Sequence, residues 1–261
     1  EAPLRDDVEA AIVLAHPQDY LDWVKAARPA ADQEPVHLDP DTVLSPGSWE
    51  AAMRAVGAGL RAVDEVMTRN VGNAFCQVRP CGHHAEVARA MGFCFFNNVA
   101  IAAHYARRKH GAERVAVVDF DVHHGNGTED IFWNDKDLFL ASTHQMPLYP
   151  GTGAVNETGV GNICNAPLRP HDGGDAFREA FAARVLPELE AFRPDLVIIS
   201  AGFDAHEDDP LANLRLREAD FAWATQQLAD VADRKAGGRL VSMLEGGYNL
   251  TALARSVGVH V

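Results

Sequence analysis

The most informative segment of this chain runs Val115-Ala-Val-Val-Asp-Phe-Asp-Val-His-His-Gly-Asn-Gly-Thr128. Its first four residues are apolar and predict a buried strand, which leads directly into two carboxylates and two imidazoles. Side chains two positions apart on a strand share a face, so Asp121 and His123 can direct an oxygen and a nitrogen toward one cation. Such a ligand set suits zinc, and suits iron(II), cobalt or manganese less distinctively. The segment therefore predicts a metal site where a buried strand ends.

Strand-like and helix-like patterns alternate along the rest of the sequence. The other apolar runs of strand length are 74–78, 138–142, 196–201 and 240–244. Helical patterns cover 18–27, 48–68, 97–110, 174–192 and 217–235, with Ser48 as a plausible N-cap. Strands buried on both faces have continuous apolar runs, so this order predicts a single-domain α/β fold, a three-layer α/β/α arrangement with a mostly parallel sheet. The Pro-, Gly- and Asp-rich segments 28–47 and 145–172 are expected to be irregular functional loops.

Composition narrows the class of protein. With 261 residues and 47% hydrophobic content, the chain can form one sizeable core, so residues 1–261 are expected to be a single catalytic domain. The net charge of −14 argues against nucleic acid or an anionic membrane as a direct partner and weakly favours a cationic substrate. The four cysteines form no Cys-x-x-Cys pair, and no signal peptide or long apolar segment is present, so we expect a cytoplasmic protein with buried thiols.

Chemically active side chains follow every predicted strand. They lie in 79–84, 119–124 and 202–204, at His144, and in 245–248. Because the carboxyl ends of parallel strands share one edge of a sheet, where ligands bind, these residues are expected to form one site.

Three side chains can form a catalytic metal site. Asp121, His123 and Asp204 leave positions open for water and substrate, as a catalytic zinc requires. Asp204 alone could equally be a helix cap or turn residue. The tandem His83-His84 suits a general base and a general acid. Asp119 could pair with one of these imidazoles, be a structural acid, or belong to a second cation site.

A tyrosine and an apolar wall complete the predicted site. Gly246 and Gly247 allow a tight turn that presents Tyr248, whose phenol could hydrogen-bond a developing oxyanion. Apolar walls could come from Phe93, Tyr149 and Leu211. Without a serine or cysteine in an elbow motif, these residues indicate hydrolysis of an amide or related C–N bond by metal-activated water.

Six segments in these regions resemble one family, the zinc-dependent histone deacetylases and acetylpolyamine amidohydrolases, which share their fold with arginase. The segments are Arg79-Pro-Cys-Gly-His-His84, Gly92-Phe-Cys-Phe-Phe-Asn-Asn98, Asp119-Phe-Asp-Val-His-His-Gly-Asn-Gly-Thr128, Tyr149-Pro-Gly-Thr-Gly153, Ala201-Gly-Phe-Asp-Ala-His206 and Leu244-Glu-Gly-Gly-Tyr-Asn249. Asn126 and Glu245 are typical of the class II branch and its bacterial relatives.

The resemblance implies a role for each matching residue. Zinc would bind Asp121, His123 and Asp204, with His83 and His84 as the catalytic pair and His84 as the proton shuttle. The residues implied around a structural potassium are Asp119, Asp121, His123, Ser142 and Thr143. Those implied in substrate binding are Asp41 at the rim, Gly92, Phe93 and Tyr149 along the acyl channel, Leu211, Gly246 and Gly247. Tyr248 would polarise the acetyl carbonyl.

Asn126 and Leu211 modify what the resemblance implies about the base and the substrate. An amide at Asn126 can orient His84 but lends no negative charge, so the base should be less basic than with a carboxylate there. Leu211 stands where a polyamine-selective relative has glutamate. The resemblance also implies that N-terminal and C-terminal segments of the domain lie outside this sequence.

The sequence leaves the substrate open between acetyl-lysine and an acetylated polyamine or other acetylated amine, and it leaves homo-oligomerisation open. One alternative is an arginase-like ureohydrolase with two manganese ions, which would need a further acid near Asp204, where Ala205 and His206 stand. The other alternative is an inactive protein that binds acyl-lysine.

Overall fold

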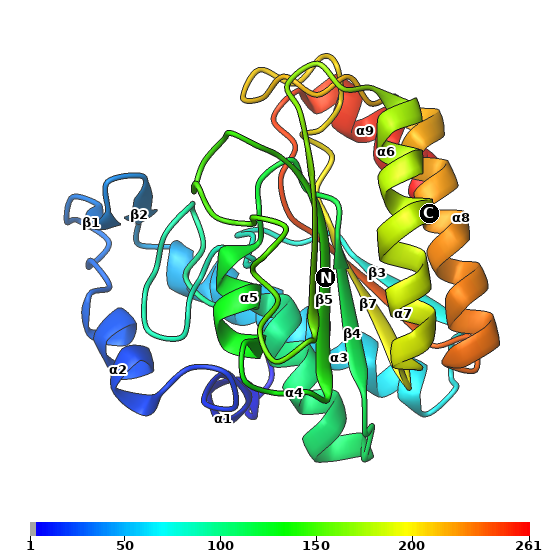
Figure 1. Cartoon of the computed structure of the whole chain (residues 1–261). Helices are drawn as coiled ribbons and strands as arrows, with labels where there is room; N and C mark the ends of the chain where they lie inside the picture. The colour runs from blue at the N-terminus through cyan, green and yellow to red at the C-terminus, as the bar shows by residue number, and fades with distance from the viewer. Residues whose placement is uncertain (1–3) are drawn as a thin grey trace.

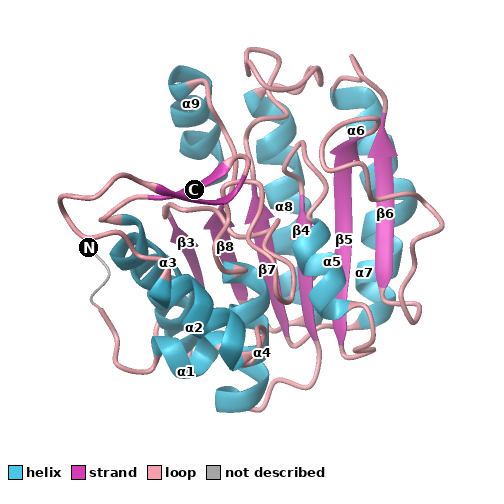
Figure 2. Ribbon diagram, turned by 90° about the vertical axis from the view of Figure 1, so that its left-hand side faces the viewer, coloured by secondary structure: helices cyan, strands magenta, loops and turns pink. Residues whose placement is uncertain are grey.

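The central sheet has six strands, all parallel, in the order β3-β8-β7-β4-β5-β6. The computed structural model describes residues 4–261. In sheet order, the strands are β3 (Asn73–Cys76), β8 (Leu240–Leu244), β7 (Leu196–Ala201), β4 (Val115–Asp119), β5 (Leu138–Gln145) and β6 (Ile163–Leu168). Their arrowheads all reach the same edge of the sheet, at the top of Figure 2. The predicted α/β class with a parallel sheet is confirmed.

Helices cover both faces of this sheet (Figure 1). On one face lie α1 (Val8–Ile12), α2 (Gln18–Ala26), α3 (Ser48–Met67), α4 (Asn98–His110) and α5 (Asn126–Phe132). On the other lie α6 (Gly174–Ala180), a π-helical turn (Phe181–Val185), α7 (Leu186–Phe192), α8 (Glu218–Lys235) and α9 (Leu250–His260). Within residues 4–261, no helix combines the length and hydropathy needed to cross a bilayer.

Two separate hydrophobic cores fill the spaces between the layers. Val117 and Ile198 belong to the core beneath α3 and α4, whereas their neighbours Val118 and Ile199 belong to the core beneath α7 and α8. Successive strand side chains point to opposite faces, so a strand in the middle layer must be apolar at every position. This requirement explains the uninterrupted apolar runs in the sequence.

The expectation that 28–47 and 145–172 are irregular was wrong only for short strands within them. The first segment contains a short antiparallel pair, β1 (Val36–Asp39) and β2 (Thr42–Leu44), and the second contains β6. β6 carries Asn165 and Pro167, which weaken a strand pattern in sequence, but a proline is tolerated on an edge strand. Pairing with β6 prolongs β5 to Gln145, so His144 lies within the strand and does not follow it.

The helices of the sequence prediction are present, with shifted ends and one wrong cap. The N-cap of α3 is Gly47, and Ser48 is the first helical residue, with its hydroxyl accepting a hydrogen bond from Ser45 N at 2.9 Å. Predicted helix 174–192 is continuous but changes to π-helical geometry in the middle. Helices α1, α5 and α9 lie outside the predicted helical ranges, and α1 and α5 have only one or two turns each.

Candidate active site

The predicted site residues lie at the carboxyl edge of the sheet. Asp119 ends β4, with Asp121 and His123 immediately after it, while Asp204 follows β7. These two strands are neighbours in the sheet, so the loops that leave them are adjacent. The segment that carries Tyr248 leaves β8, the next strand along.

Asp121, His123 and Asp204 converge on one point. His123 Nδ1 lies 3.1 Å from Asp121 Oδ1 and 3.1 Å from Asp204 Oδ2. A single ring nitrogen has one proton or one lone pair, so it cannot satisfy both carboxylates in full. Both aspartates are only 1% exposed, and burial of charged carboxylates is costly without a compensating cation.

The electrostatics of the cluster formed by Asp121, His123 and Asp204 also favour a positive charge there. Burial, together with the nearby charge of Asp121, raises the pKa of Asp204 to about 6. Burial disfavours the imidazolium of His123, yet Asp121 and Asp204 outweigh it and raise the pKa of this imidazole to about 10. A divalent cation among the three side chains would supply the missing charge, so the donor set fits zinc.

Backbone groups hold the Asp121 and Asp204 carboxylates in place. Gly246 N donates to Asp121 Oδ2 at 2.7 Å, and Val122 N donates to Asp204 Oδ1 at 2.9 Å. The opposite oxygen of each carboxylate is the one that faces His123. A Cβ on Gly202 or Gly246 would overlap these carboxylates, so only glycine lets the backbone approach this closely.

The two tandem histidines have different partners. His83 Nδ1 lies 2.9 Å from Asp119 Oδ2, and His84 Nδ1 lies 2.8 Å from Asn126 Oδ1. Both imidazoles are buried, and their ring centroids are 4.0 Å apart.

These different partners move the two pKa values apart. Burial opposes protonation of His83, but Asp119 and Asp121 outweigh burial and raise its pKa well above the ordinary value. Burial and the neighbouring His83 lower the pKa of His84 well below the ordinary value. The pair therefore combines a charged imidazolium with a neutral imidazole, which suits a general base at His84.

Glu245 is a supporting residue to which the sequence interpretation gave no role. Its Oε2 accepts hydrogen bonds from Gly82 N at 2.7 Å and His83 N at 3.1 Å, and its Oε1 accepts one from Ser200 Oγ at 3.0 Å. Its carboxylate thus ties the β8 end to the backbone of the histidine pair. Its place in the Glu-Gly-Gly-Tyr segment was the only sequence signal.

Asp209 holds the loop that carries Tyr248. Its Oδ2 accepts hydrogen bonds from Tyr248 N at 2.8 Å and Asn249 N at 3.3 Å, and its Oδ1 accepts one from Leu211 N at 3.0 Å. Burial, followed by the charges of Asp204 and other nearby groups, raises the pKa of the Tyr248 phenol. The phenol therefore keeps its proton and can donate a hydrogen bond.

Two aromatic rings and one acid lie near His84, Tyr248 and Gly92. Phe93 and Tyr149 are 40% and 39% exposed, with the Tyr149 ring 5.2 Å from that of His84 and the Phe93 ring 6.1 Å from that of Tyr248. Asp41 Oδ1 accepts a hydrogen bond from Gly92 N at 3.2 Å. Predicted rim residue Leu211 is exposed in the loop held by Asp209.

Two glycines of the predicted substrate site have positive φ values. Gly92 has a φ of 56°, and a Cβ there would overlap the His84 ring. Gly247 has a φ of 136°, which places it in a conformation that favours glycine.

The predicted potassium residues lie on adjacent strands. Asp119 of β4 and Ser142 of β5 are register partners. Ser142 Oγ lies 2.9 Å from His144 Nδ1, so this hydroxyl already has a partner. Because neighbouring residues on a strand face opposite sides, Thr143 could join Ser142 around one ion only through its backbone oxygen. The potassium site stays a prediction.

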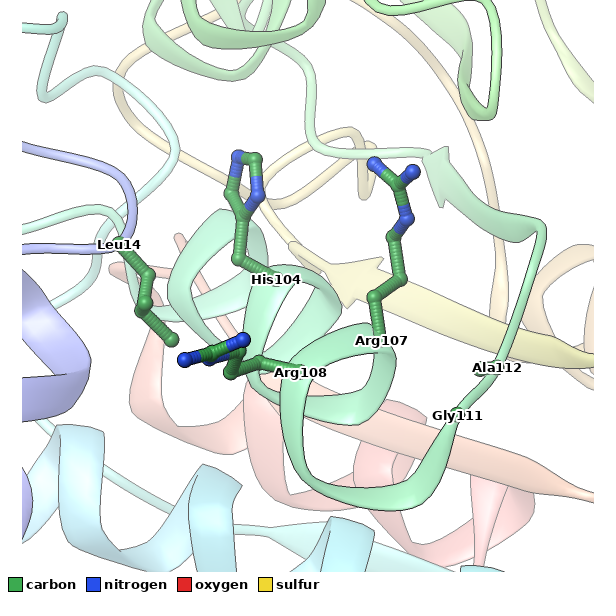
Figure 3. Close-up of a pocket in the computed structure, with 6 residues that line it drawn as sticks. All are labelled: Leu14, His104, Arg107, Arg108, Gly111 and Ala112. Atoms are coloured by element: carbon green, nitrogen blue, oxygen red, sulfur yellow. The ribbon is translucent and has the colours of Figure 1, made fainter.

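A surface pocket at the other end of the sheet is not part of this site. It is lined by Leu14, His104, Arg107, Arg108, Gly111 and Ala112 (Figure 3). Gly111 and Ala112 lead into the start of β4, opposite the carboxyl edge. Arg107 is already paired with Asp135 at 2.5 Å.

Comparison with known proteins identifies one family along the whole described chain. The sequence matches the histone deacetylase domain family over residues 4–261. It is 44% identical to an uncharacterized protein of Synechocystis sp. (98% of this chain, 82% of that protein) and 43% identical to the histone deacetylase-like amidohydrolase of Pseudomonas aeruginosa (91% and 63%). The crystal structure of the HDA15 HD domain superposes with a TM-score of 0.92 at 38% identity, over 99% of this chain and 72% of that one. The chain thus spans less than two thirds of the Pseudomonas protein.

Proposed function

This chain belongs to the histone deacetylase family, and we propose that it is a zinc-dependent amidohydrolase that removes acetyl groups from acetylated amines such as acetyl-lysine or an acetylated polyamine. The observation that carries the proposal is the convergence of Asp121, His123 and Asp204 beside a neutral His84. The ligand set, the base and the Tyr248 phenol are the parts that amide hydrolysis by activated water requires.

The metal ion would act only as a Lewis acid. A zinc ion held by the three ligand side chains would supply Lewis acidity toward the acetyl carbonyl and the attacking water. The residues of the chain would then manage the protons and the substrate. A structural potassium near Asp119 and Ser142 is proposed on the resemblance and on the register of the two strands.

His84 takes the proton of the attacking water through Nε2, because it is the neutral member of the pair. His83, kept charged by Asp119, adds positive charge where negative charge develops. The Tyr248 phenol donates a hydrogen bond to the carbonyl oxygen as that oxygen becomes negative. His84 finally passes its proton to the departing amine.

The substrate class follows from the outer part of the site. Phe93 and Tyr149 present aromatic surface to an aliphatic stem, and Asp41 adds an acid near them. Together with the net charge of −14, these features favour an amine-bearing molecule, either a lysine side chain or a polyamine.

The arginase-like alternative needs a second set of metal ligands beside Asp204, and among residues 4–261 only Asp121 and His123 group with Asp204. The next polar residue after Asp204 is His206, which is directed toward Asp208 and Glu218 and not toward the ligand cluster. The proposal therefore retains a single catalytic ion.

The proposal is tested by turnover. Zinc-loaded protein is assayed on acetyl-lysine peptides, acetylputrescine and acetylspermidine, with Tyr248→Phe as the catalytic variant and Tyr105→Phe, a distant tyrosine bonded to Asp64, as control. We expect acetate release that Tyr248→Phe lowers by at least about 100-fold and Tyr105→Phe leaves intact. Zinc-bound protein that binds an acyl-lysine peptide without releasing acetate would establish the inactive-binder alternative instead.

A further inference from the structure

The side chain of Asn126 lies between His84 and Glu86. Its Oδ1 is 2.8 Å from His84 Nδ1, and its Nδ2 donates to Glu86 Oε1 at 2.8 Å. The same Nδ2 lies 3.3 Å from Met91 Sδ. Asn126 is buried, whereas Glu86 is half-buried.

The neighbours of the Asn126 amide determine which way it is turned. A carboxylate and a thioether sulfur accept hydrogen bonds but do not donate them, so both require the NH₂ end of the amide. The reversed amide would place its oxygen against the Glu86 carboxylate. The amide oxygen is therefore directed toward His84 Nδ1, which must carry the ring proton. His84 Nε2 is then the nitrogen with the free lone pair.

Glu86 is itself held against the helix that carries Asn126. Its backbone N donates to Arg89 O at 3.0 Å, which closes a short turn. The next residue, Val87, donates its N–H to Asp130 Oδ2 in α5 at 2.9 Å. Since Asn126 is the first residue of α5, the turn and the amide are fixed to the same element.

We propose that Glu86 is a positioning residue, whose carboxylate fixes the Asn126 amide so that His84 is held in the tautomer with a free Nε2. The inference rests on the proposed function, in which His84 is the base. A carboxylate at position 126 would accept a hydrogen bond from His84 Nδ1 through either oxygen and would need no such partner. An amide has one accepting end, so its orientation depends on its neighbours, of which the Glu86 carboxylate is the stronger acceptor and Met91 the weaker.

Kinetics of a double-mutant cycle test the proposal. On an acetyl-lysine peptide, Glu86→Ala should lower kcat by about 10- to 100-fold with little change in KM, because the base loses its orientation while the substrate rim is intact. Glu86→Gln, which keeps an acceptor oxygen, should recover most of this loss. In an Asn126→Asp background, Glu86→Ala should cost less than about threefold. The control is Glu179→Ala, an exposed glutamate of α6, which should match the wild type. An equal loss in both backgrounds would overturn the proposal, since it would mean that Glu86 only holds the fold of its turn.

A spectroscopic measurement decides the same point without turnover. Two-bond ¹H–¹⁵N correlation of histidine-labelled, zinc-loaded protein reports the tautomer of each ring, with the His84 signals identified by their loss in His84→Ala. We expect a single tautomer with hydrogen on Nδ1 in the wild type and a mixture in Glu86→Ala. An unchanged tautomer in Glu86→Ala would overturn the proposal even if kcat fell. If the wild type hydrolysed no acyl amide, the proposed function would fail, but this spectrum would still decide what Glu86 does.

Discussion

Replacing Asp209 with asparagine measures how strongly turnover depends on the loop that carries Tyr248. The carboxylate accepts three backbone hydrogen bonds, from Tyr248 and Asn249 at one oxygen and from Leu211 at the other. Asparagine has one accepting oxygen, so it can accept hydrogen bonds either from Tyr248 and Asn249 or from Leu211, but not from both groups. Each hydrogen bond to a charged group contributes about 1.5–3 kcal/mol. We therefore expect Asp209→Asn to lower the free energy of unfolding by about 2–3 kcal/mol.

The effect on turnover should be larger than the effect on binding. A displacement of about 1 Å at a catalytic group can cost about 100-fold in rate, so kcat should fall between about 10- and 100-fold with KM nearly constant. The assay combines urea unfolding with steady-state hydrolysis of an acetyl-lysine peptide. The matched control is Asp208→Asn, because the side chain of Asp208 is 52% exposed and its pairing with Arg255 is a solvent-exposed contact that contributes little to stability.

A second variant shows whether Asp209 acts through the phenol. In a Tyr248→Phe background there is no phenol to position, so adding Asp209→Asn should reduce kcat by less than about threefold. The reasoning is refuted if Asp209→Asn lowers kcat by the same factor in both backgrounds. It is also refuted if the substitution destabilises the fold while kcat is unchanged.

Three further outcomes can be measured. Burial lowers the pKa of His16 to about 4, so the stability that its neutral form contributes is complete above pH 6.5 and is lost as the pH falls toward 4. In urea unfolding, the loss of stability between pH 7 and pH 5 should therefore be smaller in His16→Gln than in the wild type by roughly 2 kcal/mol. Gly246→Ala should weaken zinc binding by at least about 100-fold in a chelator competition, whereas Gly72→Ala, where a Cβ has open space, should not. Adding zinc at a hundredfold excess over Kd should stabilise apoprotein by about 2.7 kcal/mol, and Asp204→Asn should abolish most of that gain; equal stability with and without the metal would contradict the ligand assignment.

The sheet was predictable because of its burial on both faces. Strands such as β4 and β7 must be apolar at every position, and a continuous apolar run is easily recognised. β6 lies at the edge of the sheet, where Asn165 and Pro167 are tolerated, so its sequence does not have that signal. The β1–β2 pair is short and only partly buried, so it has no continuous apolar run either.

The site was predictable where its residues follow strands, and not where they act through distant partners. Asp121 and His123 are separated by one residue, so a strand end alone suggests their common role. Glu245 reaches Gly82 across 163 positions, and Asp209 reaches Tyr248 across 39, which no local pattern reveals. Glu86 is close to His84 in sequence, but its role depends on Asn126, 40 positions away.

The glycines at positions 92, 202 and 246 determine where this enzyme can diversify. At these positions the backbone lies directly against His84, Asp121 or Asp204, and any added side chain would overlap one of these three residues. Because no larger residue fits at these three glycines, substitutions there cannot adjust substrate preference in small steps. Side chains can be substituted more freely at the exposed residues of the rim, among them Phe93, Tyr149 and Leu211. In a directed-evolution experiment, substitutions that change substrate specificity should therefore accumulate at the rim, while the three glycines are retained.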